Sequence, residues 1–135
     1  MRVSTSAYCA WINNPKEEII MPFMKLRTNL VIDSAKAASL MTELSKLLAK
    51  ETAKPERYVM IDVKGDRNMM FDGSSMPLAF LECKSIGLSV AQAKSLSKSI
   101  SELLGAQLQL SADRIYIEFS NCPAEYWGWN GSTFA

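Results

Sequence analysis

The chain has 135 residues, of which 48% are hydrophobic and 21% charged, the profile of one globular domain with enough apolar residues for a core. Lys and Arg total 15 against 14 for Asp and Glu, so the net charge of +1 provides no broad positive field that would attract nucleic acid or an anionic membrane. The chain has no histidine, which excludes Ser-His and Cys-His catalysis and histidine-ligated zinc. We therefore expect neither nucleic acid nor membrane as a partner.

Residues 1–21 form a leader that fits no targeting class. They lack the apolar stretch of a secretory signal, and two adjacent glutamates argue against a transit peptide. No apolar run in the sequence approaches the roughly 20 residues that span a bilayer. The cysteines Cys9, Cys83 and Cys122 form neither a C-x-x-C pair nor an even disulfide framework. They are expected to be reduced thiols that act as small buried hydrophobes in a cytosol-like compartment.

The sequence contains an internal duplication. Residues 21–26 (MPFMKL) are echoed by residues 76–81 (MPLAFL), and residues 55–63 are echoed by residues 112–120 at nearly the same spacing. Two echoes with nearly one period indicate two copies of one structural unit. Each unit has the pattern strand, helix, strand.

In the first unit, residues 22–30 alternate as a strand, and Asp33 or Ser34 can cap the helix that follows. The helix ends before Pro55, because the residue preceding a proline is pushed out of the helical region. Residues 58–63 are β-branched and aromatic, which predicts the returning strand. The apolar face of the helix consists of Leu40, Leu44, Leu47 and Leu48.

The second unit repeats this order after a connecting segment, residues 66–75, that is predicted to be a loop or a short edge strand. Residues 78–85 are the next strand, Gly87 breaks it, residues 91–108 form a helix and residues 114–119 form the last strand. The inward residues of this helix are Leu96, Ile100, Leu103, Leu104 and Leu108.

The order βαββαβ predicts an α+β fold. A right-handed crossover in each half places both helices on one face of a four-stranded sheet. The strands carry more apolar side chains than one covered face takes, so we expect the second face to meet copies of itself in an oligomer, and we weigh this above a monomeric, ferredoxin-like ligand-binding domain. The strand residues concerned are Met24, Leu26, Met60, Phe80, Ile115 and Ile117.

The aromatic tail, residues 121–135, is by its composition either a docking or pocket-lining segment or one that seals the core of a neighbouring subunit. Spaced motifs along the chain are more specific. They are Met21-Pro22, Lys54-Pro55, residues 71–77 (FDGSSMP), Ser85-Ile86-Gly87, residues 113–117 (DRIYI) and residues 128–135 (GWNGSTFA). Together these motifs resemble the macrophage migration inhibitory factor branch of the tautomerase superfamily. The resemblance covers residues 22–135, which we expect to be the tautomerase domain.

This resemblance implies a homotrimer whose three sheets line a central barrel, with active sites at the subunit interfaces. It also implies keto-enol tautomerisation of phenylpyruvate-like 2-oxo acids or dopachrome-like compounds, with neither metal nor cofactor. The partners would be a small aromatic 2-oxo acid or enol and further copies of the chain, in the cytoplasm or after secretion without a signal peptide. The alternative is a cytokine-like signalling protein with a protein receptor and a vestigial pocket.

The resemblance implies a role for particular residues. Pro22 would be the general base, because a terminal proline is a secondary amine whose pKa falls in an apolar pocket or beside a cation. Lys54 would hold the substrate carboxylate with help from the backbone N–H of Ile86, and Tyr116 of the adjacent subunit would lie beside the amine. The apolar walls would be Phe23, Trp129 and Phe134.

The sequence departs from the family pattern in ways that bear on activity. Pro22 inside a longer chain is a tertiary amide without a basic lone pair, so translation is expected to begin at Met21, with the leader being cut off later as the other possibility. Residues 78–81 (LAFL) replace a C-x-x-C pair, which excludes thiol-disulfide exchange. Glu118 replaces a neutral amide and would raise the pKa of a nearby amine, while Trp127 replaces a smaller residue and would narrow the pocket.

Overall fold

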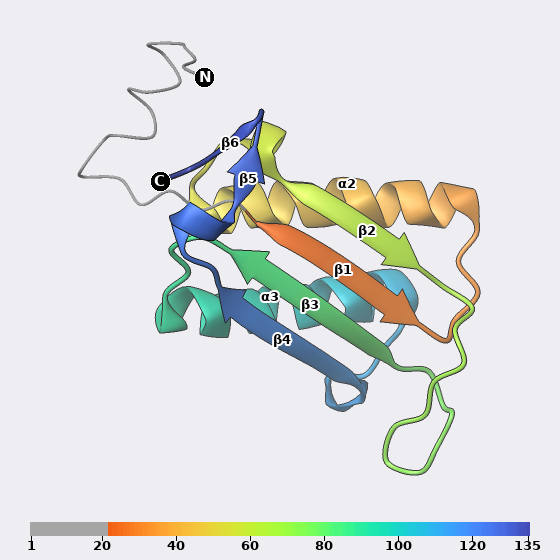
Figure 1. Cartoon of the computed structure of the whole chain (residues 1–135). Coiled ribbons are helices and arrows are strands. Elements are labelled where there is room, and N and C mark those ends of the chain that lie inside the picture. Colours follow the sequence, from red (N-terminus) through yellow and green to blue (C-terminus); the bar gives the residue numbers. More distant parts are fainter. Residues whose placement is uncertain (1–21) are drawn as a thin grey trace.

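The computed structural model describes residues 22–135. The expected leader, including Cys9, lies outside the described residues. Figure 1 shows a four-stranded sheet with both long helices packed on one of its faces. The elements are β1 (Phe23–Thr28), α2 (Ser34–Thr52), β2 (Met60–Lys64), β3 (Ala79–Ser85), α3 (Val90–Leu108), β4 (Ile115–Asn121), β5 (Gly128–Trp129) and β6 (Ser132–Thr133). Short 3-10 turns at Glu56–Tyr58, Ala112–Arg114 and Ala124–Tyr126 precede β2, β4 and β5.

The sheet joins two βαβ halves. Its strand order is β2-β1-β3-β4, with β1 and β2 parallel, β3 and β4 parallel, and β1 and β3 antiparallel. Each half therefore contributes one parallel pair and one crossover helix, as the connection of parallel strands requires. The predicted α+β fold, the duplication and the placement of both helices on one face are confirmed.

Local side-chain chemistry starts both helices. The side chain of Asp33 accepts a hydrogen bond from the N–H of Lys36 at 2.8 Å and caps α2. The second helix begins with a capping box, in which the hydroxyl of Ser89 accepts from the N–H of Gln92 and the Gln92 side chain accepts from the N–H of Ser89, both at 3.0 Å. The first helix ends at Thr52, before Pro55 as predicted.

The predicted strand at residues 58–63 is wrong at its start. The segment Glu56–Tyr58 forms a 3-10 turn in which the N–H of Tyr58 donates to the carbonyl of Pro55 at 3.2 Å, so β2 begins only at Met60. Tyr58 consequently leaves the sheet. The β5–β6 hairpin was not predicted from the sequence, because strands of two residues are too short to show an alternating pattern.

The main core lies between the sheet and the two helices. Leu40, Leu44 and Leu48 of α2 are fully buried against it, whereas Leu47 is only partly buried. The fully or almost fully buried residues of α3 and the facing strands are Leu96, Ile100, Leu104, Met24, Leu26, Leu81 and Cys83. A second, smaller cluster joins Ile86 to Phe134 outside this core.

Of the six apolar strand residues that led us to expect an apolar second face, only Met60 and Phe80 lie on the open face of the sheet. Met24, Leu26, Ile115 and Ile117 all belong to the helix-covered core, because strand alternation places them on that side of the sheet. The open face is mixed in character. Its residues by alternation are Phe23, Lys25, Arg27, Met60, Asp62, Lys64, Phe80, Glu82, Lys84, Tyr116, Glu118 and Ser120.

The two described cysteines are free thiols in different surroundings. Cys83 is fully buried in the core, whereas Cys122 is partly exposed, so the expectation of a buried thiol is confirmed for the first and wrong for the second. Burial raises the pKa of the Cys83 thiol from 9.0 to about 12, because a thiolate there would be desolvated.

The raised pKa of Cys83 predicts a loss of folding stability in alkali. The contribution of the protonated Cys83 thiol to the free energy of unfolding is complete below pH 9. It is lost between pH 9 and about 12, because this thiol ionises at a lower pH in the unfolded chain than in the folded one. Between pH 7 and pH 10.5 the wild type should lose roughly 2 kcal/mol more than Cys83→Ala, measured by guanidinium unfolding with a reductant present. Because every other ionisable group is common to both proteins, comparison with the variant isolates the contribution of Cys83. Equal losses of stability in both proteins would contradict the prediction.

Candidate functional site

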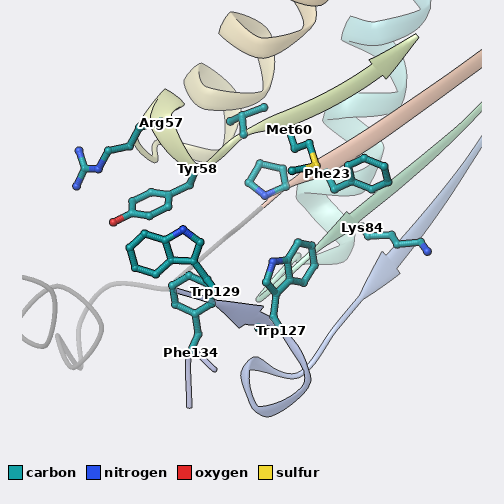
Figure 2. Close-up of a pocket in the computed structure, with 11 residues that line it drawn as sticks. Phe23, Arg57, Tyr58, Met60, Lys84, Trp127, Trp129 and Phe134 are labelled. Carbon is teal, nitrogen blue, oxygen red and sulfur yellow. The ribbon is translucent and has the colours of Figure 1, made fainter. Parts of the chain in front are cut away.

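A pocket of about 420 Å³ opens at one end of the sheet, where β1 and β2 begin and β3 ends (Figure 2). The C-terminal segment folds over this end and supplies one wall. The described residues that line the pocket are Pro22, Phe23, Arg57, Tyr58, Val59, Met60, Lys84, Trp127, Gly128, Trp129 and Phe134.

Backbone pairing positions the start of β1 at this pocket. Pro22 is buried, and its carbonyl accepts a hydrogen bond from the N–H of Met60 at 3.2 Å. Phe23 pairs with Met60 on the parallel side and with Lys84 on the antiparallel side. Three strands therefore converge on Pro22, and none of these contacts depends on a flexible side chain.

Aromatic rings form the opposite wall. The ring centroids of Trp129 and Phe134 lie 5.7 Å apart with an interplanar angle of 12°, a stacked pair. Tyr58 meets both rings edge on, at 5.8 Å from Trp129 and 6.4 Å from Phe134. The N–H of Phe134 donates to the carbonyl of Trp127 at 3.2 Å and closes the tail on itself, and the burial of Phe134 against Ile86 holds the tail to the domain.

The charges at the pocket have one sign. Arg57 and Lys84 are the charged residues among the described lining, which contains no carboxylate. Figure 2 shows them on opposite sides of the lining residues with their charged ends directed outward, and the guanidinium carbon of Arg57 lies 4.8 Å from the centroid of Tyr58. A pocket with apolar aromatic walls and cations at its rim favours a small aromatic anion.

The structure brings together only some of the site residues expected from the sequence. Pro22, Phe23, Trp129 and Phe134 share the pocket, and Ile86 packs beneath Phe134. Trp127, expected to narrow the pocket, is also part of its lining. Lys54 and Tyr116 lie outside the described lining.

Lys54 and Tyr116 occupy different places in the fold. Lys54 follows the end of α2, where its N–H donates to the carbonyl of Ala49 at 3.1 Å. Tyr116 pairs with Phe80, which pairs with Arg27, four residues further along β1 than Phe23. At the usual rise per strand residue, this distance along the sheet is about 13 Å. Tyr116 therefore lies far from the pocket of its own chain.

Sequence reasoning missed Arg57, Tyr58, Met60 and Lys84. The proline that ends α2 was visible, but the 3-10 turn after it, which turns Tyr58 toward the tail aromatics, was not. Lys84 enters the lining because β1 and β3 pair antiparallel in a register that joins it to Phe23. No local pattern in the sequence specifies that register, although the alternation of β3 does identify the side of the strand on which Lys84 lies.

Within residues 22–135, no group of three or more Cys, Asp or Glu side chains is placed to hold a metal ion. The helices of the same region include none that is long and apolar enough to cross a membrane. The fold and pocket thus define an α+β protein built from two βαβ repeats, with an aromatic pocket flanked by two cations at one end of its sheet.

Residues 21–135 match the family model described as Macrophage migration inhibitory factor (MIF), and the chain belongs to this family. The macrophage migration inhibitory factor of Meriones unguiculatus is 42% identical over 116 residues, which are 85% of this chain and 100% of that relative. A homolog from Brugia malayi is 37% identical over 115 residues, which are 84% of this chain and 99% of the relative.

Solved structures agree with this assignment. The crystal structure of a macrophage migration inhibitory factor homologue from Prochlorococcus marinus has a TM-score of 0.79 and 38% identity, and the match covers 84% of this chain and 99% of that one. The corresponding protein from Trichinella spiralis has a TM-score of 0.75 and 29% identity, over 82% and 98% of the two chains. The fold of residues 22–135 is therefore the family fold.

The cations at the rim predict a preference for aromatic anions. In a chain carrying Trp11→Phe, both remaining tryptophans line the pocket, so phenylacetate should quench the intrinsic fluorescence with a saturating curve. Arg57→Gln should weaken phenylacetate binding about two- to fivefold, the usual size of an exposed charge pair, and leave binding of neutral benzyl alcohol unchanged. Lys98→Gln on α3 is the matched control. Equal weakening of both ligands by Arg57→Gln would mean that the guanidinium contributes packing and not charge.

Proposed function

We propose that this protein is a cofactor-independent keto-enol tautomerase for phenylpyruvate-like 2-oxo acids or dopachrome-like compounds. In the active form the amine of an amino-terminal Pro22 is the general base. The observation that carries the proposal is the position of Pro22, buried at a pocket whose other described walls are aromatic or apolar and whose charges are cationic. Membership of the family supports it.

The surroundings of Pro22 suit a base that works near neutral pH. Apolar walls disfavour the charged ammonium form of a secondary amine, and the cations Arg57 and Lys84, which line the same pocket, do the same by like-charge repulsion. Both effects lower the pKa of the amine, so that more of it is free to take a proton at pH 7. The amine removes the proton from the carbon beside the substrate carbonyl and returns it to the oxygen.

The substrate's two ends have different needs. Its aromatic ring would lie against Phe23, Trp129 and Phe134, and its carboxylate would face the cationic rim. Lys54 and the N–H of Ile86 remain the proposed carboxylate ligands, and Arg57 is added because it lines the pocket. Fixed donors of this kind also stabilise the enolate as charge develops on its oxygen.

A homotrimer completes this proposed site. Tyr116 is 62% exposed and lies far from its own pocket, so it can stand beside Pro22 only if another copy supplies it. The mixed open face fits a water-filled barrel better than a dry interface, since Lys25 pairs in register with Asp62 and Glu82. Charged side chains of both signs in adjacent positions are compatible with solvent there.

The proposed base also requires a free Pro22, so the active chain would consist of residues 22–135. This boundary is supported by the family model, which begins to match at residue 21, and by a relative whose whole length is covered by 116 aligned residues. Residues 1–21 would then be absent from the active protein.

Replacing the base should abolish most of the activity. In a chain that begins at Pro22, Pro22→Gly should lower kcat for phenylpyruvate about 100-fold or more, the usual contribution of a positioned general base. The assay follows enol formation by ultraviolet absorbance. Circular dichroism and sedimentation of both proteins control for a loss of fold or assembly. Full activity in Pro22→Gly would exclude the proline-base mechanism.

The mass of the native protein tests the proposed start of the chain. The intact mass of protein isolated from its own cell should correspond to residues 22–135, and the recombinant chain of residues 1–135 should have no tautomerase activity above background. Turnover by a protein shown to retain residues 1–21 would be incompatible with an amine at Pro22.

One observation favours a second function. Glu118 lies on the same side of β4 as Tyr116 and two residues from it, so a copy that presents Tyr116 to a neighbour brings this carboxylate close as well. A carboxylate near the amine stabilises the ammonium and leaves less free base. A signalling or binding protein with a vestigial pocket is therefore the alternative. A trimer beginning at Pro22 that binds a protein receptor but turns over no aryl 2-oxo acid would establish it.

A further inference from the structure

The loop between β2 and β3, residues 65–78, extends beyond the end of the sheet opposite the pocket (Figure 1). At its tip, Phe71 and Ser74 face each other in a tight turn with two reciprocal backbone hydrogen bonds of 2.9 and 3.0 Å. The turn contains Asp72 and Gly73 in the left-handed region, with φ of 56° and 68°. This tip therefore has a defined conformation without belonging to a helix or a sheet.

One guanidinium group holds the tip of the loop to the sheet. Nη1 of Arg114 donates to the carbonyl of Phe71 at 2.7 Å, and Nη2 donates to the carbonyls of Ser74 and Met76 at 3.1 and 2.8 Å. Nε donates to the carbonyl of Pro77 at 3.3 Å. Four carbonyls on one planar group match the rigid donor fork of arginine, which the compact ammonium of lysine cannot reproduce.

The clamped loop also contacts a residue of the proposed site. The guanidinium carbon of Arg114 lies 5.3 Å from the ring centroid of Phe71. Phe71 also packs on Tyr116, with ring centroids 4.6 Å apart. Tyr116 lies only two residues after Arg114, yet 62% of it is exposed, so the Phe71 ring is the described aromatic contact that restricts it.

Other anchors hold the ends of the loop and not its tip. The side chain of Asn29 donates to the carbonyl of Ser75 at 2.8 Å and accepts from the N–H of Leu78 at 3.0 Å. At the start of the loop, the N–H of Asp66 donates to the carbonyl of Leu30 at 2.7 Å, and the N–H of Arg67 donates to the carbonyl of Thr28 at 3.1 Å. Among these contacts, the carbonyl of Phe71 accepts hydrogen bonds from Arg114 and from the N–H of Ser74 within the turn, and from neither end anchor.

We propose that Arg114 is a positioning residue for the reaction: through the loop it holds Phe71 against Tyr116, and so fixes the orientation in which Tyr116 is presented to the Pro22 pocket of an adjacent copy. The inference rests on the proposed tautomerase function and on the supply of Tyr116 by a neighbour. It assigns to Arg114 an effect at a site that lies at the far end of its own sheet.

The test is a double-mutant cycle in the trimeric protein that begins at Pro22. Arg114→Lys keeps the charge but loses the fork, and should lower kcat for phenylpyruvate about tenfold or more, since small misplacements of a catalytic group have effects of this size. KM should change less than twofold. Tyr116→Ala should lower kcat similarly, and the double variant should be no slower than Tyr116→Ala alone.

Two further variants separate positioning from folding. Phe71→Leu removes the ring contact but keeps the carbonyl that Arg114 binds, and should reproduce the kcat loss of Arg114→Lys with an unchanged oligomeric state. Arg67→Lys in the same loop is the matched control and should match the wild type. If the effects of Arg114→Lys and Tyr116→Ala on kcat multiply, Arg114 acts only on the stability of the loop and this inference is overturned. If the wild type has no turnover, the proposed function itself fails, and the inference fails with it.

Discussion

The antiparallel pairing of β1 with β3 is the constraint on which the rest of the molecule depends. It joins the two βαβ halves and sets Phe23 opposite Lys84 at one end and Thr28 opposite Ala79 at the other. Because β4 is parallel to β3, it ends where β1 begins. The tail that follows β4 therefore leaves the sheet at the same end as Pro22, and the pocket is a consequence of strand direction.

A small set of polar contacts makes that junction firm. The N–H of Cys122 donates to the carbonyl of Ser85 at 2.7 Å, which continues the alignment of β4 with β3 past the strand end. The side chain of Asn121 accepts from the N–H groups of Gly87 and Leu88 at 2.9 and 3.3 Å. These bonds hold the turn after β3 and the start of the tail together, so the aromatic wall has a fixed base.

Much of the fold could be predicted from the sequence because its signals are local. The spacing of the leucines in α2 and α3, the cap at Asp33 and the proline after α2 all act within a few residues. Alternation likewise predicted the strands but not which face of each strand is buried. Met24 and Ile115 were therefore counted in favour of an apolar second face, although both lie in the helix-covered core. The sheet side of a strand depends on pairing with segments far away in the chain.

The candidate site divides in the same way. Pro22, Phe23, Trp129 and Phe134 were named from motifs before their common pocket was visible. Lys84 and Tyr58 required the three-dimensional register and an irregular turn, neither of which has a periodic signature. The hydrogen bonds of Arg114 to the loop carbonyls could not be predicted from the sequence either, because every residue has a backbone carbonyl and the sequence does not mark which ones accept.

The separation of the two apolar clusters has a consequence for how such a molecule can change over generations. The large core between sheet and helices contains neither Phe134 nor Ile86, which belong to the smaller cluster at the tail. Substitutions at Trp127 or Trp129 therefore reshape the walls of the pocket without opening a cavity in the core. Val59 both lines the pocket and packs against the main core. For the tail residues, however, selection for a new ligand can proceed while the core that stabilises the domain is kept.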